Sequence, residues 1–430
     1  MKIRLIIITP DYPFGERGKY KFLQDEINIL NASNDYKLFD EIVIVNIKKN
    51  SSVLTGRMPI NGKLLTTSNF FDSLVSYSYA FLKLFSKETY EEWKASKTLR
   101  YKTSIIRKIR KWIIFYSTYY KIDKLTKHFL KDDHINITYS YWLLEGAYTI
   151  AKWKRESRNN IALARCHGVE VRDYETYTPF RNVVDRYCDS ISFVAEGKKA
   201  EYNRILSNII NGRHQEHNQY VHRLGVEAPK IDLIYKEEKD YDLYVISVSY
   251  VTQIKRIDLI IDALALIDDI RIKWVHFGNG KMLTHIKKYA ETKLNKKTNI
   301  YYEFYGYIEN NDLMSFYRNE YVDSIINCSD NEGIPVSLME AMSFGIIPIA
   351  RKVGGNGELV INNETGILLP EFVHPENLKE AILKVYYMKK EVDPFLMMKK
   401  RTSDYISSDY NSEANYRKFY KHMLSLVEKR

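Results

Sequence analysis

Short apolar runs alternate with longer amphipathic segments along this chain, and the alternation stops once and then begins again. The apolar runs begin at residues 2, 39, 135, 160 and 189 before the break, and at 243, 271, 299, 322, 346 and 365 after it. Strand–helix alternation of this kind builds a parallel sheet with helices on both faces. The sequence therefore predicts an α/β fold with two Rossmann-like, doubly wound domains.

A polar segment at 227–242 interrupts the rhythm and is interpreted as a linker. It divides the 430 residues, which are many for one hydrophobic core, into an N-terminal domain at 1–226 and a C-terminal domain at 243–408. Ligands of doubly wound sheets bind at the carboxyl ends of the strands. We therefore expect the two domains to face each other across a cleft that holds the ligand.

Composition argues against several classes of protein. Hydrophobic residues make up 45% and charged residues 28% of the chain, as in ordinary globular proteins. The longest apolar runs fall far short of the roughly 20 residues of a membrane-spanning helix. The first apolar run is also too short for a signal peptide, so a cytoplasmic protein is expected. The isolated Cys166, Cys188 and Cys328 suggest neither disulfides nor a zinc site.

The stretch DNEGIPVSLMEAMSFGIIPIA, from Asp330 to Ala350, carries two glutamates eight residues apart. Glu332 lies in a loop after a predicted strand, Pro335 suits the first turn of a helix, and Glu340 lies on that helix. Free N–H groups at a helix start bind anions, whereas carboxylates accept hydrogen bonds from hydroxyl groups. An anion next to a polyhydroxylated group describes a nucleotide sugar, and we expect this class of ligand.

The same stretch, extended to Val360, resembles the donor-site signature of retaining glycosyltransferases of the GT-B type, family 4, whose E-x7-E motif maps onto Glu332 and Glu340. The resemblance covers the C-terminal domain almost throughout. It is looser in the N-terminal domain, where ITPDYPFGERGKYKFLQDEINIL, RCHGVEVRD and VHRLGV carry it. It implies the GT-B fold, in which the final helix, here 409–430, packs back on the N-terminal domain.

The resemblance also implies roles for single residues of the C-terminal domain. Glu340 would bind the ribose hydroxyls of the nucleotide, and Glu332 would contact the donor sugar. The backbone amides of Gly333 and Ile334 would help to hold that sugar, and Lys255 would meet the diphosphate. The same donor site is expected to include Pro335 and Gly278.

In the N-terminal domain, the resemblance implies that His167, followed by Gly168, faces the donor sugar, and that the loop from Gly15 to Gly18 reaches the diphosphate and the acceptor. One departure concerns the diphosphate. The family commonly has an arginine a few residues before the lysine, where this chain has 249–251, and Arg256 is the candidate replacement. The predicted catalytic residues are thus Glu332, Lys255 and His167.

The implied reaction is the transfer of a hexose from a nucleotide sugar, UDP- or GDP-linked, to a hydroxyl of a saccharide acceptor, with retention and without a cofactor or metal. A nucleotide-sugar enzyme without a saccharide acceptor, of the epimerase or phosphorylase type, stays open as the alternative. Binding without catalysis is a third interpretation. Assembly of bacterial surface polysaccharide on a lipid-linked acceptor is expected by analogy alone.

The positive charge is concentrated in one stretch. Between Lys94 and Lys131 lie twelve Lys or Arg residues and one acidic residue, Asp123, which accounts for the whole net charge of +11. Apolar residues recur there at helical spacing, which predicts an amphipathic cationic helix. Docking on an anionic membrane surface is the favoured interpretation, with the protein peripheral at the inner face of the plasma membrane. The docking residues would be Arg107, Lys108, Arg110, Lys111 and Trp112.

Two other interpretations of this helix stay open. It can be a helix that faces the core and exposes a solvated charged side. A basic patch also permits nucleic-acid binding, although no nucleic-acid-binding module is visible and none is expected as a partner.

Overall fold

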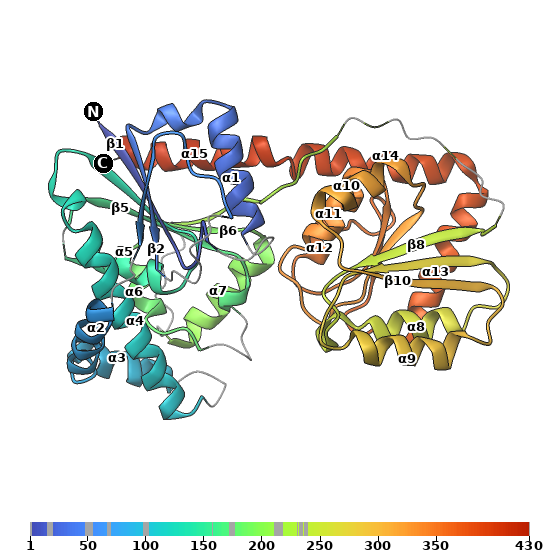
Figure 1. The fold of residues 1–430 in the computed structure, drawn as a ribbon, viewed down its shortest axis with the longest axis horizontal. Coiled ribbons are helices and arrows are strands. Elements are labelled where there is room, and N and C mark those ends of the chain that lie inside the picture. Colours follow the sequence, from blue (N-terminus) through green and yellow to red (C-terminus); the bar gives the residue numbers. More distant parts are fainter. Residues whose placement is uncertain are drawn as a thin grey trace. The chain divides into compact units, whose positions relative to one another are not determined.

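The structure is a computed structural model. It describes residues 2–14, 20–47, 55–66, 70–97, 103–156, 158–171, 177–209, 218–229, 231, 235 and 240–429. The chain divides into unit 1, made of residues 1–224 and 412–430, and unit 2, made of residues 225–411. Each unit is a parallel sheet with helices on both faces (Figure 1).

In the part of the chain that the structure describes, unit 1 contains a seven-stranded parallel sheet with the order β3-β2-β1-β4-β5-β6-β7. Its strands are β1 (Ile3–Thr9), β2 (Glu41–Asn46), β3 (Gly62–Thr66), β4 (Ile135–Ser140), β5 (Asn160–Cys166), β6 (Ser190–Phe193) and β7 (Gln219–Val221). Its helices are α1 (Lys21–Ala32), α2 (Phe70–Lys83), α3 (Lys87–Ser96), α4 (Ile105–Thr126), α5 (Glu145–Arg155), α6 (Arg181–Tyr187), α7 (Glu196–Ile209) and α15 (Ser412–Glu428).

Unit 2, described without gaps from residue 240 on, contains a six-stranded parallel sheet with the order β10-β9-β8-β11-β12-β13. Its strands are β8 (Leu243–Val248), β9 (Ile272–Phe277), β10 (Ile300–Gly306), β11 (Ser324–Asn327), β12 (Ile347–Arg351) and β13 (Ile367–Leu369). Its helices are α8 (Ile257–Ala265), α9 (Leu283–Leu294), α10 (Asn310–Asn319), α11 (Val336–Ser343), α12 (Asn356–Leu359), α13 (Pro375–Lys390) and α14 (Val392–Asp409).

The two strand orders confirm the predicted pair of doubly wound domains. Each sheet grows outward in one direction and then restarts beside its first strand, at β1 and β4 in unit 1 and at β8 and β11 in unit 2. The sequence did not predict β3, β7, α2, α3, α6, α12, α13 or α14. β3 and β7 are short edge strands, and only one of their residues is fully buried, so they lack the apolar run that reveals the central strands.

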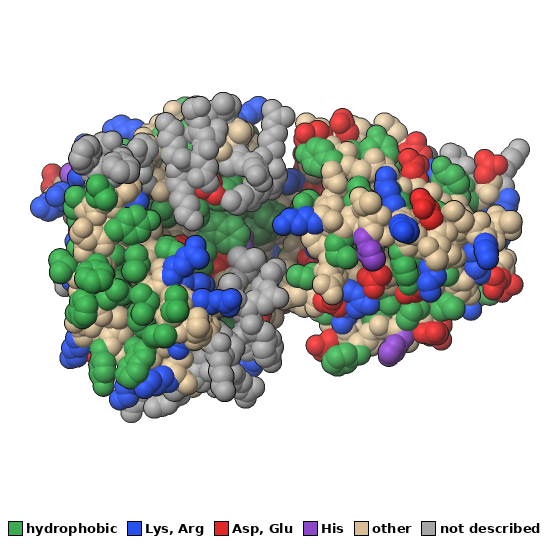
Figure 2. Space-filling view, turned by 60° about the horizontal axis from the view of Figure 1, so that its bottom comes forward, with side chains coloured by type: hydrophobic (Ala, Val, Ile, Leu, Met, Phe, Trp, Pro, Cys, Tyr) green, Lys and Arg blue, Asp and Glu red, His purple; other side chains and the backbone are tan. Residues whose placement is uncertain are grey.

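Helix α4 is the predicted cationic helix, and its apolar side faces the core. Trp112, Phe115 and Tyr116 are buried, and Trp112 Nε1 donates a hydrogen bond of 2.8 Å to the hydroxyl of Tyr177. The prediction that Trp112 contacts a membrane was therefore wrong, because its indole fills space inside unit 1. Large apolar side chains are nevertheless exposed over the neighbouring helices α2 and α3 (Figure 2).

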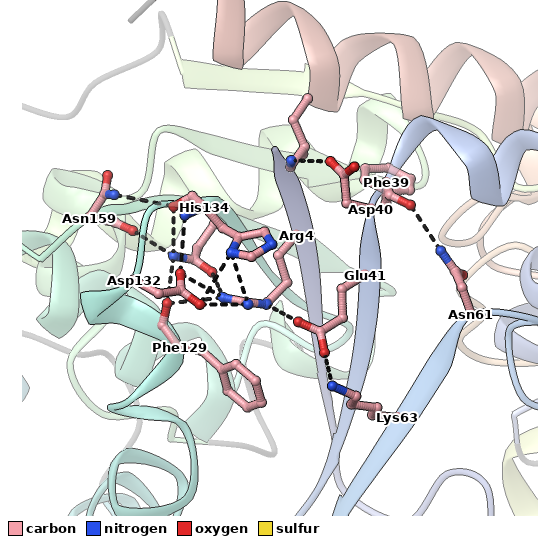
Figure 3. A network of polar contacts seen from close by, with 12 residues as sticks. Arg4, Phe39, Asp40, Glu41, Asn61, Lys63, Phe129, Asp132, His134 and Asn159 are labelled. Atoms are coloured by element: carbon pink, nitrogen blue, oxygen red, sulfur yellow. Dashed lines mark hydrogen bonds and ion pairs between the residues drawn. The ribbon is translucent and has the colours of Figure 1, made fainter. Parts of the chain in front are cut away.

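A buried arginine joins the amino ends of three strands in unit 1 (Figure 3). Arg4 of β1 is in register with Glu41 of β2 and Asn136 of β4, and its guanidinium bonds to both side chains. It also donates to the carbonyl of Phe129 at 3.1 Å and pairs with Asp132 at 2.6 Å. The hydrogen bond from Arg4 lowers the pKa of Asp132 to about 2. A guanidinium has five N–H donors, so one side chain can bond to groups from all three of these strand ends.

Helix α15 is held on unit 1 by a second buried arginine. Arg165 of β5 pairs with Glu26 of α1 at 3.0 Å, and both side chains are almost fully buried. The guanidinium lies 3.7 Å from the ring centre of Phe419, and Tyr420 of the same helix donates a hydrogen bond of 3.0 Å to the Glu26 carbonyl. Buried ion pairs are costly to break, because the surviving partner keeps an uncompensated charge. The C-terminal helix is therefore an integral part of unit 1.

The buried Glu92 of α3 makes the stability of unit 1 depend on pH. Its carboxylate accepts hydrogen bonds from the hydroxyl of Tyr177 and the amide of Phe180, and burial raises its pKa from 4.5 to about 7. The folded state therefore holds the Glu92 proton at pH values where the unfolded chain has lost it. This contribution to stability is full below pH 4.5 and is lost as the pH rises to about 7.

We predict that Glu92→Gln removes this dependence. Between pH 5 and pH 8, the free energy of unfolding of the wild-type protein should fall relative to that of the variant by on the order of 2 kcal/mol. Urea unfolding followed by tryptophan fluorescence measures it, since four of the five tryptophans lie in unit 1. Parallel pH profiles of the two proteins would contradict the prediction.

Candidate functional site

Two loops of unit 2 meet where its strand order reverses. β8 and β11 are neighbours, with Ser324 in register with Val245, and the loops that follow them are 249–256 and 328–335. The amide of Asp330 donates a hydrogen bond of 2.8 Å to the carbonyl of Ile254, which ties the loops together. In doubly wound sheets this reversal point, at the carboxyl ends of the strands, is where ligands bind.

The two loops bring a cation and a carboxylate into contact. Lys255 Nζ lies 2.6 Å from Glu332 Oε1, which also accepts a hydrogen bond of 3.2 Å from Asn327 at the end of β11. The side chain of Glu332 is 9% exposed and that of Lys255 is 25% exposed. The structure thus joins two of the three residues predicted to be catalytic. Asn327 was missed, because one asparagine at a strand end gives no recognisable signal.

The loop after β12 packs closely on the Glu332 loop. Gly354 has a φ of +50°, and a Cβ at this position would lie 1.9 Å from the carbonyl oxygen of Glu332. The amide of Gly355 donates a hydrogen bond of 2.7 Å to the carbonyl of Gly333. Only glycine permits both the left-handed backbone and this approach. The Gly-Gly pair therefore fixes the backbone that presents Glu332.

A second close approach supports the loop after β8. Gly278 has a φ of +144°, and a Cβ there would lie 1.8 Å from the carbonyl oxygen of Ser249. A Cβ on Gly280 would lie 2.3 Å from the carbonyl oxygen of Val251. Gly278, predicted to bind the donor, thus lies against the backbone of the loop that leads to Lys255.

Glu340 has surroundings of its own. Pro335 precedes α11, as predicted for a residue that starts a helix, and Glu340 lies on that helix with 4% of its surface exposed. Its Oε1 accepts a hydrogen bond of 2.9 Å from Asn310, the first residue of α10. Glu332 and Glu340 are therefore held by different partners, and Asn310 was not predicted from the sequence.

Arg256 does not share the contact between Lys255 and Glu332. Its guanidinium lies 3.0 Å from Asp258 and 3.4 Å from Asp330, and its hydrogen bond with Asp258 raises its pKa. Asp330 also pairs with Arg351 of β12. The proposed replacement for the family's arginine is thus held by two carboxylates. It lines a cavity of about 460 Å³ together with Thr252, Gln253, Asp258, Met282, His285, Ile286 and Asp330.

In unit 1, His167 lies at the carboxyl end of β5. Its ring is 4.5 Å from that of Tyr141 and 4.8 Å from that of Trp142, both in the loop after β4. Burial lowers its pKa well below the ordinary value, so the ring is neutral at neutral pH. Its Nε2 is buried and has no hydrogen-bond partner among the described residues.

Glu170 fixes the backbone around this histidine. Its carboxylate accepts hydrogen bonds from the amides of His167 at 3.2 Å, Gly168 at 2.8 Å and Leu143 at 3.3 Å. These contacts join the loops after the neighbouring strands β4 and β5, and β4 is one of the two strands at which the strand order of unit 1 reverses. The predicted loop from Gly15 to Gly18, including Gly15, lies outside the described residues.

Metal-binding sites and membrane-spanning helices were also sought among the described residues. Among them, no group of three or more His, Cys, Asp or Glu side chains is placed to hold a metal ion. None of the described helices is long and apolar enough to cross a bilayer.

Comparison with known proteins agrees with this geometry. Residues 232–395, which include both loops and Glu340, match the family of group 1 glycosyl transferases. An uncharacterized glycosyltransferase of Methanocaldococcus jannaschii is 32% identical over 155 residues, which are 36% of this chain and 40% of the relative. The chain spans less than half the length of each curated relative that it matches.

Solved structures extend the likeness to both units. The lipopolysaccharide outer core galactosyltransferase WaaB is 16% identical, with a TM-score of 0.66 and coverage of 98% of this chain and 100% of the other. HepE of Anabaena, in complex with UDP and glucose, is 12% identical, with a TM-score of 0.60 and the same coverage. At these identities the likeness shows the fold, and it confirms the predicted GT-B architecture.

We predict that Gly354→Ala disturbs the Glu332 loop. The added methyl group strains a left-handed backbone and meets the Glu332 carbonyl, so the variant should lose roughly 1–3 kcal/mol of stability. Gly357→Ala is the matched control, because its Cβ would meet nothing nearer than 3.7 Å. Thermal unfolding followed by circular dichroism compares them, and equal midpoints would contradict the close approach.

Proposed function

We propose that this protein is a retaining glycosyltransferase that moves a hexose from a nucleotide diphosphate sugar to a hydroxyl group of a saccharide. The observation that carries the proposal is the contact between Lys255 and Glu332, held at the reversal point of a sheet whose residues match the family of group 1 glycosyl transferases. One partner can neutralise a diphosphate and the other can accept hydrogen bonds from sugar hydroxyls.

Lys255 can serve both partners. An ammonium group has three N–H donors, so Lys255 can keep its bond to Glu332 and still donate to a phosphate oxygen. The amides of Gly333 and Ile334 follow Glu332 directly, and the Gly354–Gly355 contact fixes their backbone. Glu340, oriented by Asn310, accepts hydrogen bonds from the ribose hydroxyls. Each residue thus has a supporting contact that fixes its direction.

In the proposed reaction, the bond between the anomeric carbon and the diphosphate oxygen breaks, and its electron pair leaves with the nucleoside diphosphate. The acceptor hydroxyl attacks the anomeric carbon from the same face, and its proton passes to a departing phosphate oxygen. Lys255 stabilises the negative charge as it develops, a contribution of about 3 kcal/mol for one preorganised donor. The reaction uses no resident cofactor and no metal ion.

The acceptor is proposed to be a lipid-linked saccharide in the assembly of a bacterial surface polysaccharide. Support comes from the similarity to WaaB, which acts on the lipopolysaccharide outer core, and the UDP bound to HepE supports a nucleotide sugar as donor. His167, neutral and beside Tyr141 and Trp142, is proposed to contact the donor sugar.

We predict that Lys255→Ala and Glu332→Gln each reduce transfer strongly. Loss of one charge-stabilising group typically lowers kcat 10²–10³-fold, and we expect about this effect for Lys255→Ala. The assay measures release of nucleoside diphosphate from a panel of UDP and GDP sugars, with and without lipid-linked acceptors. Lys287→Ala, on the exposed side of α9, is the matched control. Release that no acceptor stimulates would favour an enzyme without a saccharide acceptor.

A separate prediction concerns Arg256. If it replaces the family's arginine, its guanidinium must turn from Asp258 and Asp330 toward the diphosphate, and Arg256→Ala should weaken binding of UDP or GDP about tenfold. Isothermal titration measures this affinity. Unchanged affinity in Arg256→Ala, together with loss of binding in Lys255→Ala, would leave Arg256 as a structural residue that positions Asp330.

A further inference from the structure

On helix α2, several large apolar side chains are exposed to solvent, whereas Tyr79 and the small residues Ser76 and Ala80 pack against the protein. Ser76 and Ala80 are fully buried, and Ser76 Oγ lies 2.9 Å from Ser117 Oγ of α4. In contrast, Leu74, Phe81 and Leu82 are 54%, 58% and 72% exposed. This is the reverse of a helix that is stabilised by burying an apolar stripe against its own core.

The exposed apolar surface continues beyond α2. Of the 22 large hydrophobic residues that are exposed in the described chain, nine lie between residues 74 and 106. They are Leu74, Val75, Tyr77, Phe81, Leu82, Phe85, Tyr90, Ile105 and Ile106, which we call the α2 apolar surface. Figure 2 shows apolar side chains gathered on this side of unit 1. Concentrations of this kind on a soluble domain mark interaction sites.

Positive charge surrounds the α2 apolar surface. The exposed basic residues of the same helices and the segment that follows are Lys87, Lys94, Lys97, Arg107, Arg110, Lys124, Lys127 and Lys131. Most acidic side chains of this region are buried or form ion pairs. Glu88 pairs with Arg155 at 2.8 Å, Glu92 is buried and Asp123 pairs with Arg158, so Glu91 is the one exposed acidic side chain among those described between 73 and 131.

We propose that the α2 apolar surface and its basic border form a docking site for an anionic lipid bilayer. The apolar and aromatic side chains enter the interfacial region, while the lysine and arginine side chains bind lipid phosphates. The site retains Arg107 and Arg110 from the sequence prediction and replaces the buried Trp112 with α2. Lys108 contributes no docking contact, because its Nζ is bonded to Ser96 Oγ at 2.9 Å, and Lys111 is bonded to the carbonyl of Tyr177.

The positive charge around the α2 apolar surface favours an anionic bilayer as its partner over a second copy of this chain. Two copies that met through this surface would bring two basic borders together, and like charges at an interface oppose association. An anionic bilayer complements the same charges and also accepts the apolar side chains. Because this surface does not include the donor site, lipid binding can be tested independently of sugar transfer.

The test is co-sedimentation of the full chain with vesicles. Vesicles of phosphatidylcholine alone are compared with vesicles that contain 30 mol% phosphatidylglycerol, at about 0.1 M and 0.5 M salt. We expect binding to the anionic vesicles, with reduced binding at high salt. The double variant Leu82→Gln/Phe85→Gln should lower the partition coefficient about tenfold or more. The double variant Arg107→Gln/Arg110→Gln should lower it roughly fivefold per charge at low salt.

Matched controls come from unit 2. Phe372→Gln removes an aromatic side chain that is 80% exposed, and Lys287→Gln/Lys288→Gln removes two exposed charges. Neither should change vesicle binding. Unfolding midpoints and UDP affinity should stay constant in all variants, which separates loss of docking from loss of folding or of the donor site.

Three results would overturn the proposal. The first is no binding to either vesicle, and the second is equal binding to neutral and anionic vesicles. The third is a dimer of the wild-type protein in sedimentation velocity that Leu82→Gln/Phe85→Gln converts to a monomer, because the surface would then be covered by a second copy.

Discussion

The candidate site depends on one constraint, which is that the sheet of unit 2 reverses its order between β8 and β11. Two loops leave the sheet side by side at that point, and the hydrogen bond from Asp330 to the carbonyl of Ile254 joins them. The contact between Lys255 and Glu332 follows from this junction, since each residue lies within two positions of the bond. The glycines at 278, 280, 354 and 355 then let neighbouring loops pack against the two backbones. The strand order therefore determines where the candidate site lies, and the packing of the loop backbones determines how Lys255 and Glu332 are oriented.

The two ends of the sheet in unit 1 are built differently. At the amino end, Arg4 joins β1, β2 and β4 through hydrogen bonds and ion pairs with neighbouring carboxylates, an amide side chain and a carbonyl group. At the carboxyl end, the carboxylate of Glu170 accepts hydrogen bonds from backbone amides. Nε2 of His167 is buried there and has no partner among the described residues. A buried polar atom without a partner costs free energy, and such atoms often mark functional positions. A ligand with a hydrogen-bonding group would satisfy Nε2 of His167 at the carboxyl end of β5.

The sequence was sufficient for the fold because the central strands are continuous apolar runs between helical patterns, as in β1 and β12. It also predicted Lys255, Glu332 and Glu340 as site residues through the resemblance, and the structure brings the first two into contact. It did not reveal Asn310 or Asn327, which act through contacts between segments far apart in the chain or at a strand end. It also assigned Trp112 to the wrong side of α4. An amphipathic helix has one apolar face whether it packs on protein or on lipid, and only the neighbouring elements, such as the segment that carries Tyr177, decide which.

Charge is used in two ways along this chain. In unit 2, Lys255 and Arg256 are paired at short range with carboxylates, an arrangement that gives directional contacts to a small ligand and resists screening by salt where it is partly buried. In unit 1, Arg107 and Arg110 are exposed beside apolar side chains, and exposed charges act over about a Debye length and weaken as salt rises. A compact anion suits the first arrangement and an extended anionic surface suits the second. Because the entire net charge of +11 falls within residues 94–131, the long-range attraction of this protein for anionic surfaces originates in unit 1 and not at the proposed donor site.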